Sequence, residues 1–223
     1  MNGTGNAVSS GVWFMVMSHN SEASQSGVQM LHPGSRKLFR YWETLRAERP
    51  CPDRSDIDFR QIVEIIPNLA ILEWDSLQNK WIYRLAGTEI CTLMGSSQTG
   101  QNALAGWDNF EKDVVSKSLV IARDRSQPCL VRMRLVYANA PILPLEMVVV
   151  PVNDVKVDEL RLFAGFFPLL SGRTFQPTTL IRRELVSARM IWTEHKAGDA
   201  LLDQVGRKAA PTLRLIQGGL SSH

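Results

Sequence analysis

The sequence predicts an α+β fold: a five-stranded antiparallel sheet with helices on one face, preceded by an aromatic N-terminal helix. Three observations predict this class. Two strand-like segments within residues 69–86 are joined by a short turn. Residues 131–137 alternate apolar and polar side chains at a period of two, and two further strand-like segments, 145–152 and 160–168, follow. Helical patterns occupy the interval between the two groups of strands.

The first element of the domain is predicted to be an amphipathic helix. Residues 1–34 are predicted to be a disordered N-terminal segment, because residues 18–34 are rich in Ser, Gln, Gly and Asn and show no periodicity. Ser35 offers an N-cap, and the helix ends before Pro50. Its apolar stripe must pack on the domain or on a second copy of the helix. The candidate dimer or partner interface consists of Leu38, Phe39, Tyr41, Trp42 and Leu45.

One short helix is expected before the first strand pair and another after it. The apolar residues of segment 59–66 predict a helix that Pro67 stops. After the strand pair, Gly87 ends the second strand and Thr88 caps a helix that Gly95 terminates. The buried side of that helix is expected to hold Ile90, Leu93 and Met94.

A longer helix follows a loop that is rich in Gly, Ser and Gln. Asp108 and Glu111, three residues apart, form a capping-box pattern at its start. Phe110, Val114 and Ile121 are expected to face the core. The helix leads into the alternating strand at 131–137.

The sensor domain is predicted to span residues 35–172, with a basic C-terminal extension at 173–223. The last fifty residues hold seven Lys and Arg against four Asp and Glu, which accounts for the net charge of +3. A basic amphipathic helix is predicted there, with Arg182, Arg183 and Arg189 off its apolar stripe. We expect it to dock on protein. Its stripe consists of Ile181, Leu185, Ala188 and Trp192.

Four separated segments occur in an order that is typical of one family. They are LFRYWE at 38–43, RSDID at 54–58, IPNL at 66–69 and YRLAGTE at 83–89. On these segments the chain resembles the PAS domain family, and more narrowly small stand-alone bacterial PAS proteins. The resemblance implies helices crossing one face of the sheet over a hollow, and a sensory role. PAS folds host haem, flavin, organic acids, or only a protein partner.

The residues around the expected hollow argue against a cofactor and against catalysis. Residues 88–125 contain no histidine that could ligate haem, and Cys91 does not stand in the asparagine–cysteine–arginine motif of a flavin photoreceptor. Residues 95–100 lack both a Gly-x-Ser-x-Gly elbow and a phosphate-binding lysine. We expect no catalytic residue, metal site, haem or flavin, and leave an unidentified small ligand open.

The cysteines and the hydropathy predict a cytoplasmic protein. Cys51, Cys91 and Cys129 are about forty residues apart and form neither a zinc pattern nor a disulfide framework. No segment approaches the roughly 20 apolar residues of a membrane span.

A candidate ligand cavity is expected between the helices and the sheet. Whether its side chains line a cavity or fill the core stays open, because burying each one stabilises the fold by about 1.5–3 kcal/mol. Arg84 either faces the hollow and binds a ligand carboxylate, or faces away as a surface arginine or a partner of Asp56 or Asp58. Strand alternation favours the second, as it sends Arg132 and Arg134 outward. The candidate lining residues are Tyr83, Leu85, Cys91, Met94, Trp107, Phe110, Met133, Leu135 and Phe166.

These observations predict a non-catalytic PAS-type regulatory protein that acts in signal transduction through protein–protein interaction. We expect a homodimer with an unknown signalling partner. The alternative is a transcription-linked or nucleic-acid-associated factor that uses the basic tail. The balanced charge of the main domain argues against a nucleic-acid groove there.

Overall fold

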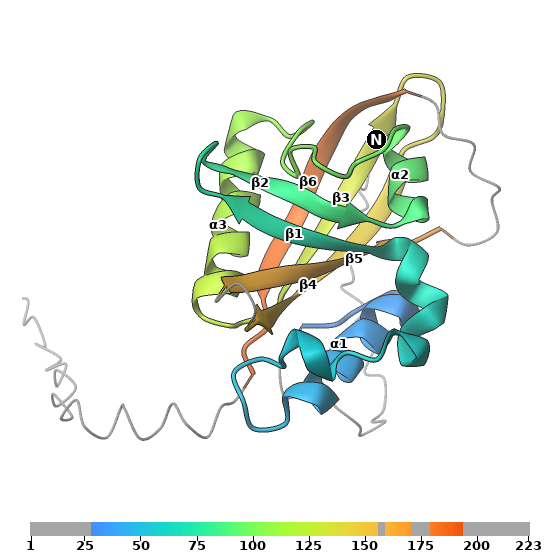
Figure 1. The fold of residues 1–223 in the computed structure, drawn as a ribbon. Helices are drawn as coiled ribbons and strands as arrows, with labels where there is room; N and C mark the ends of the chain where they lie inside the picture. Colours follow the sequence, from blue (N-terminus) through green and yellow to red (C-terminus); the bar gives the residue numbers. More distant parts are fainter. Residues whose placement is uncertain (1–27, 156–158, 171–178, 194–223) are drawn as a thin grey trace, which may run out of the picture.

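The computed structural model describes residues 28–155, 159–170 and 179–193 (Figure 1). Segments 1–27 and 194–223 lie outside the described residues, and with them most of the predicted disordered N-terminus and the last part of the predicted C-terminal extension. The predicted α+β class is confirmed. Of the segment predicted to be disordered, residues 28–32 lead into the first helix, and Pro33 and Gly34 are its first two residues.

One antiparallel sheet of six strands forms the centre of the fold, in the order β2-β1-β5-β4-β3-β6. The five predicted strands are confirmed and a sixth is added. The strands are β1 Leu69–Asp75, β2 Lys80–Ala86, β3 Cys129–Tyr137, β4 Leu143–Asp154, β5 Glu159–Pro168 and β6 Leu180–Met190.

Helices cover both faces of the sheet, not one face only. The α2 and α3 helices pack on one face, which we call the inner face, while α1 and η2 pack on the opposite, outer face (Figure 1). The bounds are α1 Pro33–Arg46, η1 Arg54–Asp56, η2 Phe59–Asn68, α2 Thr88–Met94 and α3 Asn109–Asp124. The short helix predicted at 59–66 is present as 3-10 turns.

The core consists of two apolar clusters: the inner cluster lies between the sheet and the helices α2 and α3, and the outer cluster lies between the sheet and α1 and η2. The β4 strand contributes to both. Met147 and Val149 face the inner cluster, and Val148 and Val150 face the outer one. All four side chains are buried, because helices cover each face. This explains why the segment is apolar throughout instead of alternating with polar residues.

The α1 helix docks on its own domain. Leu38 and Trp42 are each 2% exposed and pack in the outer cluster. His32, not Ser35, is the N-cap: its Nδ1 accepts a hydrogen bond from the Gly34 amide at 2.9 Å. Pro33 then occupies the first helical turn, where no amide hydrogen is needed.

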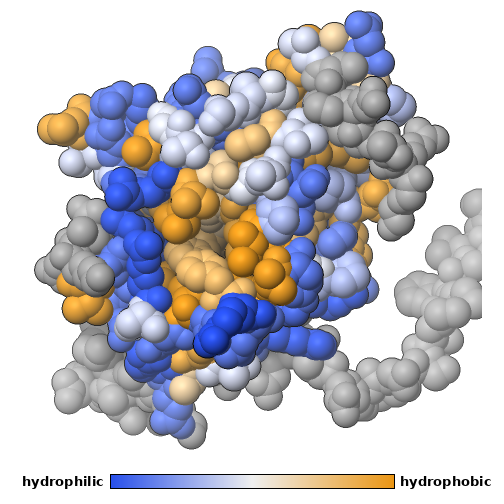
Figure 2. Space-filling view, turned by 45° about the vertical axis from the view of Figure 1, so that its right-hand side comes forward, coloured by the Kyte–Doolittle hydropathy of each residue, from blue (hydrophilic) through white to orange (hydrophobic). Residues whose placement is uncertain are grey.

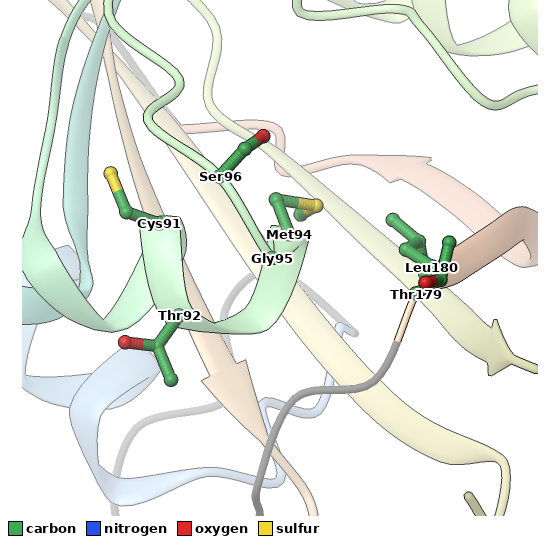
Figure 3. A pocket seen from close by; sticks show the side chains of 7 residues that line it. All are labelled: Cys91, Thr92, Met94, Gly95, Ser96, Thr179 and Leu180. Atoms are coloured by element: carbon green, nitrogen blue, oxygen red, sulfur yellow. The ribbon is translucent and has the colours of Figure 1, made fainter. Parts of the chain in front are cut away.

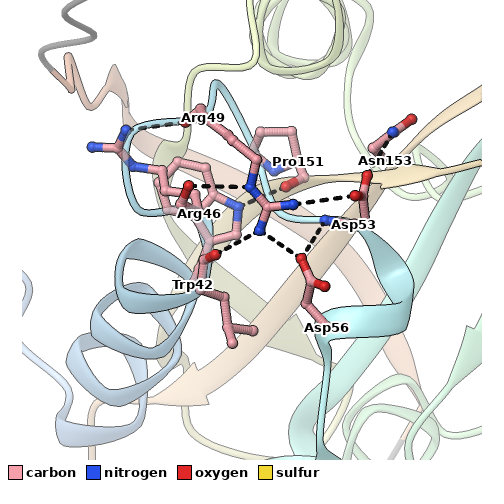
Figure 4. Close-up of polar contacts among 8 residues, drawn as sticks. Trp42, Arg46, Arg49, Asp53, Asp56, Pro151 and Asn153 are labelled. Carbon is pink, nitrogen blue, oxygen red and sulfur yellow. Dashed lines mark hydrogen bonds and ion pairs between the residues drawn. The ribbon is translucent and has the colours of Figure 1, made fainter.

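A cluster of ion pairs at the end of α1 ties the helix to η1 and β4 (Figure 4). Arg49 donates to the Leu45 carbonyl oxygen at 2.8 Å and to the carboxylates of Asp53 at 3.1 Å and Asp56 at 2.6 Å. The Asp53 carboxylate also accepts a hydrogen bond from the side-chain Nδ2 of Asn153 on β4 at 2.7 Å. The Arg49 hydrogen bond holds the pKa of Asp56 below its ordinary value.

The start of α3 confirms Asp108 as its N-cap, whose carboxylate accepts from the Glu111 amide at 2.8 Å. The inward side of the helix was predicted wrongly: Phe110 is 77% exposed and Ile121 is 38% exposed. A second stripe with the same helical spacing faces the sheet instead. It consists of Val115, Leu119 and Ala122.

The prediction of a basic amphipathic helix after residue 172 is wrong, because residues 180–190 form β6 at the edge of the sheet. Its residues pair with β3, as in Val131 with Ala188 and Met133 with Leu185. Two register shifts interrupt this pairing, so the apolar residues fall at spacings that imitate a helix. The sheet therefore includes residues beyond 172. Arg182, Arg183 and Arg189, the basic residues of the nucleic-acid alternative, therefore lie on a strand and not on a helix.

Candidate functional site

The free edge of β2 is covered by the loop that connects α2 to α3. The Tyr83 amide donates to the Gln101 carbonyl oxygen at 3.0 Å, and the Ala103 amide donates to the Trp81 carbonyl oxygen at 2.9 Å. Trp107, at the end of this loop, is 9% exposed. The loop thus closes the hollow between α3 and the sheet.

Side chains nearly fill this hollow. The remaining inner cavity has a volume of about 10 Å³, which is room for about one water molecule. The side chains therefore fill most of the space between the helices and the sheet in this structure. The inner cavity is lined by Leu72, Tyr83, Ala103, Leu104, Trp107, Val115, Leu119, Met133, Met147, Phe166 and Arg183.

The nine candidate residues fall into three groups. Tyr83, Trp107, Met133 and Phe166 line the inner cavity, and Leu135 is buried in the same cluster. Met94 and Cys91 line a second pocket, described below. Leu85 and Phe110 belong to neither pocket, as they are 53% and 77% exposed.

A β-bulge explains the position of Leu85. Leu72 pairs with Tyr83, but the preceding residue, Ile71, pairs with Leu85, so Arg84 is skipped. Because a bulge interrupts the alternation of faces, Tyr83 is buried while Leu85 is exposed. Arg84 points outward as expected.

The partner of Arg84 differs from the prediction. Its Nε lies 3.3 Å from the Glu73 carboxylate on β1. Asp56 and Asp58, the partners considered from the sequence, instead pair with Arg49 and Arg60. Arg84 is therefore part of a cross-strand ion pair.

Arg183 on β6 is the functional candidate that the sequence reading missed. It is 4% exposed and lines the inner cavity. Its Nη1 donates to the Ala103 carbonyl oxygen at 2.8 Å, and its Nη2 lies 3.3 Å from the Met94 sulfur. Two successive arginines on a strand point to opposite faces, so the pair Arg182-Arg183 would have revealed one buried arginine had the segment been read as a strand.

Two tyrosines lie on the inner face with their hydroxyl groups in different situations. The Tyr137 hydroxyl donates to the Leu93 carbonyl oxygen at 2.8 Å. Burial raises the pKa of Tyr137, and the charge of Arg183 opposes that rise. The Tyr83 hydroxyl is fully buried and has no hydrogen-bond partner among the described residues.

A larger pocket opens to the surface beside α2. This pocket, which we call the outer pocket, has a volume of about 680 Å³. Figure 2 shows a face of the molecule on which hydrophobic residues gather in a hollow bordered by hydrophilic ones. In Figure 3 the Met94 side chain extends from the end of α2 toward Leu180 at the start of β6. The lining residues are Cys91, Thr92, Met94, Gly95, Ser96, Thr179 and Leu180.

Met94 connects the two spaces. It lines the outer pocket and also contacts Arg183, which lines the inner cavity. Methionine has three rotatable side-chain bonds and repacks easily. Met94 therefore lies between the outer pocket and the buried guanidinium of Arg183.

A second buried charge lies on the outer face. The Glu146 carboxylate accepts hydrogen bonds from the amides of Leu31 at 3.0 Å and His32 at 3.0 Å, and from Arg132 Nε at 3.2 Å. Burial alone would raise the pKa of Glu146, but these hydrogen bonds lower it below its ordinary value. Glu146 thus fixes the segment that precedes α1 to the sheet.

The remaining site classes find no support within the described ranges. No group of three His, Cys, Asp or Glu side chains there could hold a metal ion. Among the same residues, no helix combines the length and the apolar character that crossing a bilayer requires.

Comparison with known protein families gives a match. A protein-family model described as PAS domain matches residues 30–166. The matched range includes α1 and ends within β5, so β6 and Arg183 follow it. No curated protein matches this chain.

Proposed function

Since this chain belongs to the PAS domain family, we propose that it is a non-catalytic regulatory protein that receives a signal in its inner face and passes it on by protein–protein contact. A sensory role is general for this family. We propose further that the protein has no catalytic activity, that it forms a homodimer and that it is located in the cytoplasm.

The observation that carries the proposal is the sharing of β4 and β5 between the two apolar clusters. On β5, Leu162 and Phe166 pack in the inner cluster, on the face that holds the inner cavity. Phe163 and Phe167 pack in the outer cluster, on the face that α1 covers. Because protein interiors are close-packed, a change on one face of these strands displaces side chains on the other. This arrangement supports transmission from the hollow to α1.

The proposed output surface is the part of α1 that the domain does not cover. Leu38 and Trp42 are buried in the chain itself, whereas Phe39, Tyr41 and Leu45 are only half-buried. Apolar side chains of the neighbouring η2, including Val63 at 62% exposure, extend this surface. We propose that a second copy of the chain covers it.

Light scattering of the full chain tests the dimer. Phe39→Asp should convert a dimer to a monomer, because it places a charge in the interface. Leu77→Asp is the matched control, since Leu77 is 97% exposed in the turn between β1 and β2. A monomeric native protein, or a Phe39→Asp protein that remains dimeric, would contradict the proposal. Deleting α1 is a poorer test because it would expose the outer cluster.

A further inference from the structure

We propose that the inner face binds a small organic carboxylate, whose carboxylate group pairs with Arg183 and whose apolar body lies in the outer pocket. The inference rests on the proposed sensory function and deepens it by naming the chemical class of the signal.

Arg183 is a buried cation with too few acceptors. Three arginines are buried among the described residues, and two of them have carboxylate partners: Arg161 with Asp154 at 3.0 Å, and Arg46 with Glu43 at 3.6 Å. Arg183 forms no ion pair with a described residue, which distinguishes it from the other two. Its Nε, like that of Arg161, has no hydrogen-bond partner among the described residues. A buried charge without a counter-ion costs free energy, which an anionic ligand would offset.

The sulfur of Met94 occupies the position where an anionic oxygen would bind better. A thioether is a weak acceptor for a guanidinium N–H, whereas a carboxylate accepts two such bonds in parallel. Rotation of Met94 would open the outer pocket to Arg183. The inner cavity, at about 10 Å³, cannot hold the body of a ligand, but the outer pocket, at about 680 Å³, can.

Tyr83 supplies a second unused donor. Its hydroxyl is buried without a partner among the described residues, and its side chain lines the same inner cavity as Arg183. Buried hydroxyl groups are normally hydrogen-bonded. A bound carboxylate would accept from this hydroxyl as well as from the guanidinium.

Thermal unfolding of the full chain with aliphatic carboxylates tests the inference. Butyrate and hexanoate at millimolar concentration should raise the Tm, because a ligand that binds only the folded state stabilises it. Hexanamide has the same body without the charge and should give little or no shift.

Three variants locate the site. Arg183→Met should abolish the hexanoate response or weaken binding by about tenfold or more, while leaving the Tm without ligand equal to or above that of the native protein. Tyr83→Phe should weaken binding less, with an unchanged Tm without ligand. Arg182→Met removes the same charge from an exposed neighbour and should respond like the native protein.

Three results would overturn the inference. The first is no shift of the native Tm with butyrate and hexanoate, and the second is equal shifts for Arg183→Met and Arg182→Met. The third is an equal response to hexanamide, because the charge would then be irrelevant. These outcomes are independent of the dimer test. Loss of the hexanoate response leaves the Phe39→Asp result standing, and a monomeric protein that still responds to hexanoate would retract only the output surface.

Discussion

The indole Nε1 of Trp42 donates a hydrogen bond of 2.6 Å to the carbonyl oxygen of Pro151 (Figure 4). The two residues are 109 positions apart in the sequence, on α1 and β4. Both partners of this bond are buried. It fixes how deeply α1 enters the outer cluster, so α1 is a structural part of the domain as well as the proposed output element.

Trp42→Phe should lower the free energy of unfolding by about 1–2 kcal/mol, because it keeps an aromatic ring but leaves the Pro151 carbonyl oxygen without this donor. Urea unfolding measures the loss. Trp192→Phe is the control, since Trp192 is 66% exposed. Equal effects of the two substitutions would show that the hydrogen bond contributes nothing.

Glu146→Gln should lower the free energy of unfolding at pH 7 by about 1–3 kcal/mol, because a charged acceptor of several buried hydrogen bonds is lost. The pKa of Glu146 is lower in the folded state, so the unfolded state binds more protons in acid and the native protein loses this contribution as the pH falls through the folded pKa. The variant should lose less stability than the native protein in that acidic range. Denaturation at several pH values measures both effects, and Glu89→Gln, at an exposed carboxylate, is the control.

Cys129 should resist alkylation in the folded protein. Burial raises the pKa of its thiol to about 12, so roughly one thiol in ten thousand is ionised at pH 8. Cys51 and Cys91 are half-buried and should react first. Intact mass after iodoacetamide treatment should show at most two additions until urea is added. A rapid third addition without urea would be inconsistent with the packing of β3.

Gly87→Ala should destabilise the protein by about 1–3 kcal/mol, because the new Cβ would lie 2.2 Å from the Pro67 carbonyl oxygen, a backbone atom. This glycine allows η2 and the start of α2 to approach each other. Gly100→Ala meets no atom within 4 Å, and its positive φ of 81° should cost about 1 kcal/mol. A smaller loss of Tm for Gly87→Ala than for Gly100→Ala would contradict this reading.

Local patterns predicted most elements correctly. The alternation of Val131, Met133 and Leu135 placed β3 with its buried face, and all three are at most 1% exposed. Asp108 was found from its spacing to Glu111, because an N-cap depends only on residues within one turn. Four of the nine cavity candidates line the inner cavity. Tyr83, Met133 and Phe166 lie on β2, β3 and β5 and face the same side of the sheet, and Trp107 lies in the loop before α3.

The errors share a physical cause. Phe110 was placed inward because two helical stripes on α3 have the same spacing, and only the sheet selects between them. Leu85 was placed inward because a bulge cannot be read from alternation. Arg183 was missed because the state of β6 depends on pairing with β3, about fifty residues earlier in the sequence.

The sequence by itself determined the α+β class, the antiparallel sheet and the membership in the PAS family, because strand periodicity, turns and caps act between near neighbours. The tertiary structure alone decided that α1 covers the outer face, that the C-terminal segment joins the sheet, and that one arginine is buried beside Met94. Those outcomes depend on which surfaces meet after the chain has folded, and register shifts between distant strands change the facing of each side chain without leaving a local pattern.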